Sequence, residues 1–213
     1  MLIQNFNFFT IKTNSINIEN LSFGGVGGGG KTYALTQFLI YKAVTEQCRI
    51  LCLREFSNSQ KASLINEFKA LILEQDLEAH FKERLDLAPK ERAVKILGAE
   101  IQFKHNGSQI LFAGINDNTA MSLKSISNIK YAFIEESDFL TEYAYNILKP
   151  TIRAKNSKLF YTFNPRDKDA FIYQKALTNN DELCKCVKVN YYDNLEFPEV
   201  LDIDREQNKK TMP

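Results

Sequence analysis

The stretch FGGVGGGGKTYAL, residues 23–35, decides the fold that we expect for this chain. It places six glycines in seven positions directly before a lysine and a threonine. Gly loses more conformational freedom on ordering than any other residue, so such a run needs a physical reason. Gly25 to Thr32 fit the pattern G-x-x-x-x-G-K-[ST] of a phosphate-binding loop, or P-loop, between a strand-like segment at 17–23 and a helix-like segment at 32–46.

The chemistry of phosphate binding explains the residue types in this loop. Phosphates approach the backbone so closely that side chains would clash, and the amino end of a helix adds partial positive charge. We expect Lys31 to contact the β- and γ-phosphates of ATP and the Thr32 hydroxyl to ligate Mg²⁺. The predicted nucleotide-binding residues are Gly25, Val26, Gly27, Gly28, Gly29, Gly30, Lys31 and Thr32. The alternative is a glycine-rich strand-to-helix turn that binds nothing.

Strand-like and helix-like segments alternate along the rest of the chain. Continuous apolar runs predict buried strands at 49–55, 130–137, 158–165 and 184–192. A capping box at 57–60 and apolar residues at helical spacing from Leu64 to Ile72 predict a helix. This alternation predicts an α/β fold with a mainly parallel sheet flanked by helices.

Two local features decorate that pattern. Residues 100–114 predict an antiparallel hairpin, in which Asn106 and Gly107 supply the positive φ angles of a tight turn. A short helix is expected from about Thr141, with Asp138 as its cap, and it cannot continue past Pro150.

A second motif stands at the end of the apolar run at 131–134, where Glu135 and Glu136 follow. We expect Glu135 to hold Mg²⁺ and Glu136, as the catalytic acid of the site, to orient the attacking water. Two adjacent carboxylates repel each other unless a cation is near, so a metal or Lys31 is expected beside them. The alternative is a strand that runs into solvent with two surface glutamates.

The run at 158–165 ends sharply at Asn164 and Pro165. Because side chains alternate along a strand, Thr162 and Asn164 share one face. They could sense the γ-phosphate or its attacking water, or Asn164 could simply start a turn.

The composition restricts the partners and the compartment. The 213 residues suffice for the core of one domain, and 27 basic residues against 26 acidic ones leave no overall cationic field, so any DNA contact needs a local patch. The spacings C-x3-C and C-x-C of the four cysteines fit reduced thiols in a cytosolic protein better than a zinc site. No signal peptide and no membrane-spanning apolar run are found, so no membrane partner is expected.

The segments GGVGGGGKT, RILCLREFSNSQKASL, LFAGINDNTAMSLKS, YAFIEESDFL, LKPTIR and LFYTFNPR, in this order, resemble the large terminase subunit of tailed bacteriophages, most closely the prophage type. The resemblance implies an ASCE-type P-loop ATPase domain over residues 1–194. It also implies a motor that couples hydrolysis of ATP with Mg²⁺ to translocation of double-stranded DNA into a capsid. Its partners would be the portal, the small terminase subunit and further copies in a ring, in the cytoplasm of a bacterial host. By the same resemblance Glu135 is the metal ligand, Glu136 the catalytic acid, and residues 162–164 the motif that couples hydrolysis to movement.

The chain departs from the family pattern in two respects. An arginine usual inside the loop is missing, and Arg54, Arg153 and Arg166 are the candidates to replace it as an arginine finger, in cis or from a neighbouring subunit. Residues 195–213 are expected to be a linker toward a nuclease domain that this sequence lacks, so no cutting activity is predicted. For DNA, Lys124 is a candidate phosphate contact, although an ordinary solvated lysine explains it equally well.

Two other functions compete with the DNA-translocating ATPase. One is a small-molecule phosphotransferase on the same P-loop core. The other is a catalytically silent or weakened prophage remnant that keeps the fold and binds nucleotide without efficient turnover.

Overall fold

The computed structural model describes residues 20–25, 30–55, 58–88, 91–164, 169–178 and 184–189. Within these residues the strands are β1 (Asn20–Gly25), β2 (Arg49–Arg54), β3 (Val94–Leu97), β4 (Glu100–Phe103), β5 (Ser108–Gly114), β6 (Tyr131–Ile134), β7 (Lys158–Phe163) and β8 (Cys184–Val189). The helices are α1 (Lys31–Thr45), α2 (Asn58–Glu74), α3 (Leu77–Arg84), α4 (Glu142–Leu148) and α5 (Phe171–Thr178), with short 3₁₀ turns η1 (Ala120–Ser125), η2 (Ser137–Phe139) and η3 (Lys149–Thr151).

The strands form one sheet in the order β3-β4-β5-β2-β6-β7-β1-β8. From β5 to β8 every neighbouring pair is parallel, whereas β3 and β4 are antiparallel additions at one end. The predicted mainly parallel α/β sheet with an antiparallel hairpin is therefore confirmed. Strand β7 lies between β1, which leads into the glycine loop, and β6, which leads into the acid pair.

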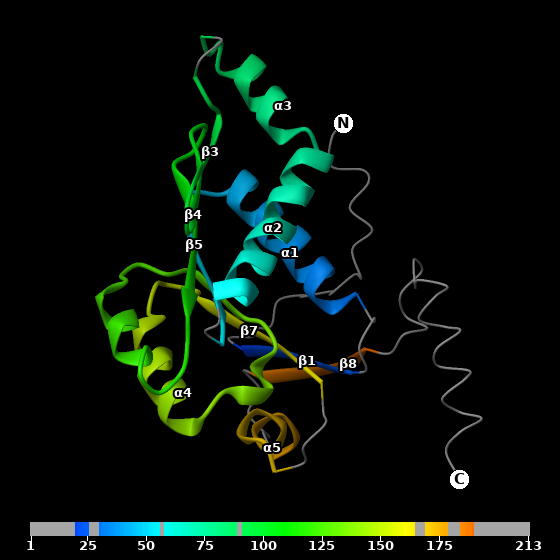
Figure 1. Ribbon diagram of the computed structural model, residues 1–213, viewed down its shortest axis with the longest axis vertical. Coiled ribbons are helices and arrows are strands. Elements are labelled where there is room, and N and C mark those ends of the chain that lie inside the picture. Colours follow the sequence, from blue (N-terminus) through cyan, green and yellow to red (C-terminus); the bar gives the residue numbers. More distant parts are fainter. Residues whose placement is uncertain are drawn as a thin grey trace, which may run out of the picture.

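The alternation of side chains along β2 explains the two-layer cover of the sheet. Ile50 and Cys52 belong to a buried cluster with α1, α2 and α3, and Leu51 and Leu53 belong to a second cluster with η1, α4 and α5. Figure 1 shows the first three helices on one side of the sheet and α4 and α5 on the other. Because β2 is buried on both faces, its sequence is a continuous apolar run and does not alternate between apolar and polar residues.

The hairpin between β4 and β5 forms as predicted, but its turn differs in detail. Among the described residues of this turn only Gly107 has a positive φ, of 75°, so the expectation for Asn106 is wrong. The Asn106 side chain instead donates to the carbonyl of Ala43 (2.8 Å) and accepts from the Ser108 N–H (3.0 Å). A tertiary contact with the end of α1 thus replaces the expected local turn geometry.

The expected cap of α4 is also wrong. Thr141 is the N-cap, since its hydroxyl accepts from the Ala144 N–H at 3.1 Å, while Asp138 belongs to η2. Helices α3 and α5 and strand β3 were not predicted, and the capping residue expected at 57 lies outside the described residues. No helix in the described part of the chain is long and apolar enough to cross a bilayer.

Candidate functional site

The carboxyl ends of β1, β6 and β7 meet at one edge of the sheet, where α1 begins. Gly30 precedes α1 with φ 70° and ψ 11°, a left-handed conformation that glycine adopts without steric cost. Residues 26–29 lie outside the described residues, so the predicted loop is seen at its two ends, Gly25 and Gly30. The predicted strand–loop–helix context of the P-loop is present.

Lys31 lies at the first turn of α1 and reaches the end of β7. Its ammonium donates to Asn164 Oδ1 at 3.1 Å. Burial lowers the pKa of Lys31, and the nearby Asp138 carboxylate opposes this shift. A lysine whose charge is partly desolvated is stabilised by an anion, and phosphate groups are anions that this position can accept.

Thr32 and Glu135 are brought together from α1 and from the end of β6. The Glu135 carboxylate accepts a side-chain hydrogen bond from Thr32 and lies 3.4 Å from Arg54 Nη1. Burial raises the pKa of Glu135, while Arg54 and Thr32 lower it and Glu136 raises it further. Glu135 Oε2 accepts no hydrogen bond from the described residues. This oxygen instead faces Arg54 Nη1 in the ion pair, and the Thr32 hydroxyl and the Glu135 carboxylate are hard oxygen donors of the kind that Mg²⁺ prefers.

Glu136 is more exposed than Glu135 and has an unusual backbone. Its φ of 47° is left-handed, a conformation that costs a non-glycine residue about 1–3 kcal/mol. Its N–H donates to Thr162 Oγ1 at 3.3 Å, and its carboxylate forms an ion pair with Arg54 Nη2. The side chain of Glu136 is 50% exposed, so this carboxylate is accessible to water.

Thr162 and Asn164 therefore link the two motifs. Thr162 is buried and contacts Glu136, its carbonyl accepts from Ser137 Oγ at 3.0 Å, and Asn164 contacts Lys31. The Asn164 N–H donates to the Asp138 carboxylate at 3.0 and 3.2 Å. Because β7 lies between β1 and β6, its end bridges the P-loop lysine and the acid pair.

The three candidate arginines have different positions. Arg54 ends β2, its side chain is only 14% exposed, and it pairs with Glu135 and Glu136 within this site. Arg153 lies between η3 and the start of β7, at the opposite edge of the sheet, and is exposed. Arg166 lies outside the described residues. Lys124 lies exposed in η1, in the connection from β5 to β6.

Two further acidic residues belong to the site, of which the sequence interpretation assigned one to another role and missed the other. Asp138 was assigned to the cap of α4, but it positions Asn164 and lies close enough to Lys31 to influence its pKa. Glu67 of α2 faces Arg54 and Glu135, and burial with the Glu135 charge raises its pKa to about 7. The sequence carries a signal for Glu67, because it falls between Leu64 and Leu71 on the buried stripe of α2.

The sheet order, the glycine loop before α1 and the acids at the end of β6 define the class of P-loop nucleotide-binding proteins. The family model described as phage terminase large subunit matches residues 17–212, so the chain belongs to that family. No curated protein matches this chain.

Solved structures show the same fold. The large terminase of a thermophilic bacteriophage in complex with ADP is similar with a TM-score of 0.71 and 16% identity, covering 97% of this chain and 48% of that one. The ATPase domain of the Thermus phage P74-26 large terminase is similar with a TM-score of 0.66 and 8% identity, covering 94% of this chain and 85% of that one. The large terminase of bacteriophage HK97 is similar with a TM-score of 0.65 and 12% identity, covering 90% of this chain and 43% of that one. The chain thus spans about half the length of the ADP-bound large terminase and most of the P74-26 ATPase domain.

Proposed function

We propose that this chain hydrolyses ATP and acts as the motor domain of a viral DNA-packaging machine. The observation that carries the proposal is the convergence of three motifs. Thr32 contacts Glu135, Lys31 contacts Asn164, and Glu136 contacts Thr162. The large terminase of the thermophilic bacteriophage, which has the same fold, has been solved with ADP and with ATP-γ-S.

In this proposal the residues of the site have separate tasks. Lys31 and the loop from Gly25 to Gly30 bind the phosphates, and Thr32 and Glu135 hold Mg²⁺. The metal, when bound, neutralises charge on the phosphate oxygens. Glu136 is the general base, because its carboxylate is accessible to water and lies beside the buried Glu135.

Arg54 is the candidate to replace, in cis, the arginine that the loop lacks. It is already inside the site and touches both glutamates, whereas Arg153 could act only from a neighbouring subunit. Thr162 and Asn164 would transmit the state of the phosphates to the acid pair through β7, which is the proposed coupling role. Lys124 is a candidate DNA contact because it is exposed.

The remaining parts of the proposal come from the family. They are double-stranded DNA as the translocated substrate, a ring of copies, the portal and small subunit as partners, and the host cytoplasm as location. Residues 195–213 as a linker toward a nuclease domain belong to the same proposal and lie outside the described residues.

The proposal is tested by phosphate release from ATP and Mg²⁺, with and without double-stranded DNA. We expect DNA-stimulated release. Glu136→Gln should keep ATP affinity and lower the hydrolysis rate by about 10²–10⁴-fold, because it removes the general base. Glu142→Gln, an exposed acid in the first turn of α4, is the matched control.

Each other outcome assigns the chain differently. Phosphate transfer to a small acceptor would make it a phosphotransferase, and nucleotide binding without turnover would make it a silent remnant. Hydrolysis by Glu136→Gln at the parental rate would remove Glu136 from its proposed role.

A further inference from the structure

The amino ends of the three central strands β2, β6 and β7 are basic. Arg49 begins β2, Lys130 directly precedes β6, and Lys158 begins β7. Backbone hydrogen bonds align them, because Lys130 N–H donates to Arg49 O and Lys158 N–H to Lys130 O, both at 2.9 Å. Neighbouring strands lie about 4.8 Å apart, so the backbones of these three residues lie within about 10 Å along this edge, with Lys158 in register with Tyr131.

Further cations extend this row. Arg153 and Lys155 are exposed in the connection from η3 to β7, and Lys42 comes from the last turn of α1. We call the set Lys42, Arg49, Lys130, Arg153 and Lys155 the amino-edge patch. The segments 42–49, 126–131 and 152–158 that carry it contain one acidic residue, Glu46.

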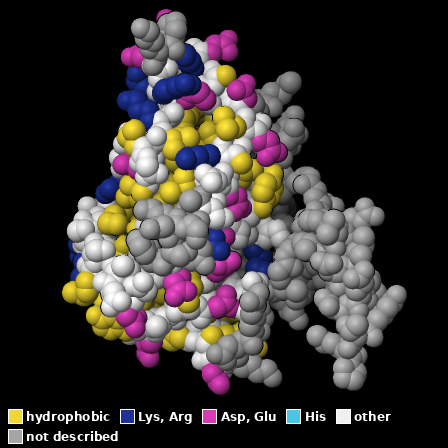
Figure 2. All heavy atoms as spheres, in the orientation of Figure 1, with side chains coloured by type: hydrophobic (Ala, Val, Ile, Leu, Met, Phe, Trp, Pro, Cys, Tyr) yellow, Lys and Arg dark blue, Asp and Glu magenta, His cyan; other side chains and the backbone are white. Residues whose placement is uncertain are grey.

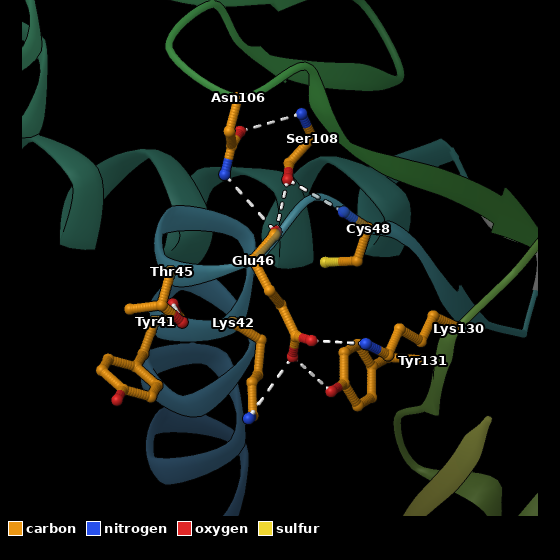
Figure 3. A network of polar contacts seen from close by, with 9 residues as sticks. All are labelled: Tyr41, Lys42, Thr45, Glu46, Cys48, Asn106, Ser108, Lys130 and Tyr131. Atoms are coloured by element: carbon orange, nitrogen blue, oxygen red, sulfur yellow. Dashed lines mark hydrogen bonds and ion pairs between the residues drawn. The ribbon is translucent and has the colours of Figure 1, made fainter. Parts of the chain in front are cut away.

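Glu46 neutralises only part of the patch. Figure 3 shows its carboxylate between Lys42 and Lys130, where it also accepts a hydrogen bond from the hydroxyl of Tyr131. Arg153 and Lys155 have no ion-pair partner among the residues that the structure describes. Among the described residues, Arg153 and Lys155 without an ion-pair partner, together with Lys42, Arg49 and Lys130 around Glu46, leave a local positive charge in a chain whose net charge is +1.

Other exposed basic residues lie in mixed surroundings. Figure 2 shows Lys and Arg side chains interspersed with Asp and Glu over the upper part of the molecule, around α3 and β3. Ion pairs account for two of them, Arg92 with Glu78 at 3.9 Å and Lys104 with Glu91 at 3.5 Å. A polyanion would therefore meet opposing acids there, whereas Glu46 is the acid within the described segments of the amino-edge patch.

We infer that the amino-edge patch binds the phosphate backbone of double-stranded DNA. The inference rests on the proposed function for the choice of DNA and on the charges described above for the surface. At the carboxyl ends of the strands Glu135, Glu136 and Asp138 balance the charges of Arg54 and Lys31, so the opposite edge is the more favourable one for an extended polyanion. The contacts are with phosphates, so binding is independent of base sequence and falls with salt.

The test uses fluorescence anisotropy of a labelled duplex of mixed sequence, titrated with the full chain without nucleotide between about 50 and 200 mM salt. We expect measurable affinity at low salt for the parent protein. The double variant Arg153→Glu with Lys155→Glu should bind at least about tenfold more weakly, and the slope of log K against log salt should fall by about 2. Unchanged thermal melting and an unchanged far-UV circular dichroism spectrum would show that this variant is folded.

Two further variants test whether the change in DNA affinity depends on the charge of the patch itself. Lys69→Glu with Lys95→Glu changes the net charge equally on α2 and β3, and it should reduce affinity by less than about threefold. Glu46→Gln removes the one acid beside Lys42 and Lys130 and should raise the affinity severalfold. Equal loss in both double variants, no binding by the parent protein, or weaker binding by Glu46→Gln would each overturn the inference.

Competition separates DNA from an acidic protein surface. We expect unlabelled duplex DNA to displace the probe at far lower charge concentration than poly-glutamate. Equal displacement would assign the patch to an acidic protein partner instead and overturn the choice of DNA. A chain that binds DNA through the patch but does not hydrolyse ATP would contradict the proposed function and leave this inference standing. If the parent chain hydrolyses ATP and the Arg153 and Lys155 variant binds DNA normally, the proposed function stands and this inference is overturned.

Discussion

The two edges of the sheet use the same three strands for different electrostatic tasks. At the carboxyl ends of β2, β6 and β7, Glu135 is buried beside Arg54, and their side chains are 8% and 14% exposed. At the amino ends, Glu46 and Lys130 form an ion pair whose side chains are 28% and 29% exposed. Burial raises the free energy of a charged group and shifts its pKa, whereas charges in contact with water are screened by water and salt. The first edge therefore suits chemistry, and the second suits salt-dependent contact with an anion.

The sharpest test of this difference removes the cation from each edge. Arg54→Met leaves two carboxylates without their counter-ion, one of them buried, and should lower the free energy of unfolding by about 3 kcal/mol. Lys130→Met is the matched change at the other edge and should cost less than about 1 kcal/mol, because its pair is less buried and Lys42 remains beside Glu46. Urea unfolding of both variants without nucleotide measures the difference. Equal costs would show that burial does not distinguish the edges.

The two edges also differ in how far the sequence predicted them. The carboxyl edge carries strict local patterns, namely Lys31 and Thr32 after glycines and Glu135 after an apolar run, so its main residues were predicted from the sequence alone. The alignment of Arg49, Lys130 and Lys158 depends on strand order, because these residues are far apart in the chain. No local pattern marks such a patch.

The same distinction explains the errors. Asp138 satisfies the local requirements of a helix cap, but it contacts Asn164, 26 residues away, and Thr141 caps α4 instead. Helix α3 was missed because LEAHFKER is short and mostly polar, so its apolar period is weak. Arg54 was a candidate finger, and only the pairing of β2 with β6 shows that it lies beside both glutamates.

A second prediction concerns the proton content of the carboxyl edge. Burial and the Glu135 charge raise the pKa of Glu67 from 4.5 to about 7, so the folded state favours the neutral acid. The stabilisation that this gives is complete below about pH 4.5 and is lost as the pH rises through about 7.

Glu67→Gln should therefore gain stability relative to the parent protein as the pH rises from 5 to 8, by about 2 kcal/mol. Unfolding in urea at both pH values, without nucleotide, measures this change. Glu74→Gln, on an exposed position of the same helix, controls for loss of one negative charge. A stability difference that does not change with pH would contradict the coupling between Glu67 and Glu135.

The smallest expected effect tests whether the amino edge also has a structural role. Tyr131 is buried, and its hydroxyl donates to Glu46, so this network ties the end of α1 to the start of β6 (Figure 3). Tyr131→Phe keeps the ring but removes that hydrogen bond, and we expect a loss of about 1 kcal/mol in the free energy of unfolding. Tyr143→Phe, at an exposed position on α4, should change the stability by less than about 0.5 kcal/mol. If both variants are equally stable, Glu46 is held by its lysines alone, and the amino edge contributes charge rather than rigidity to the fold.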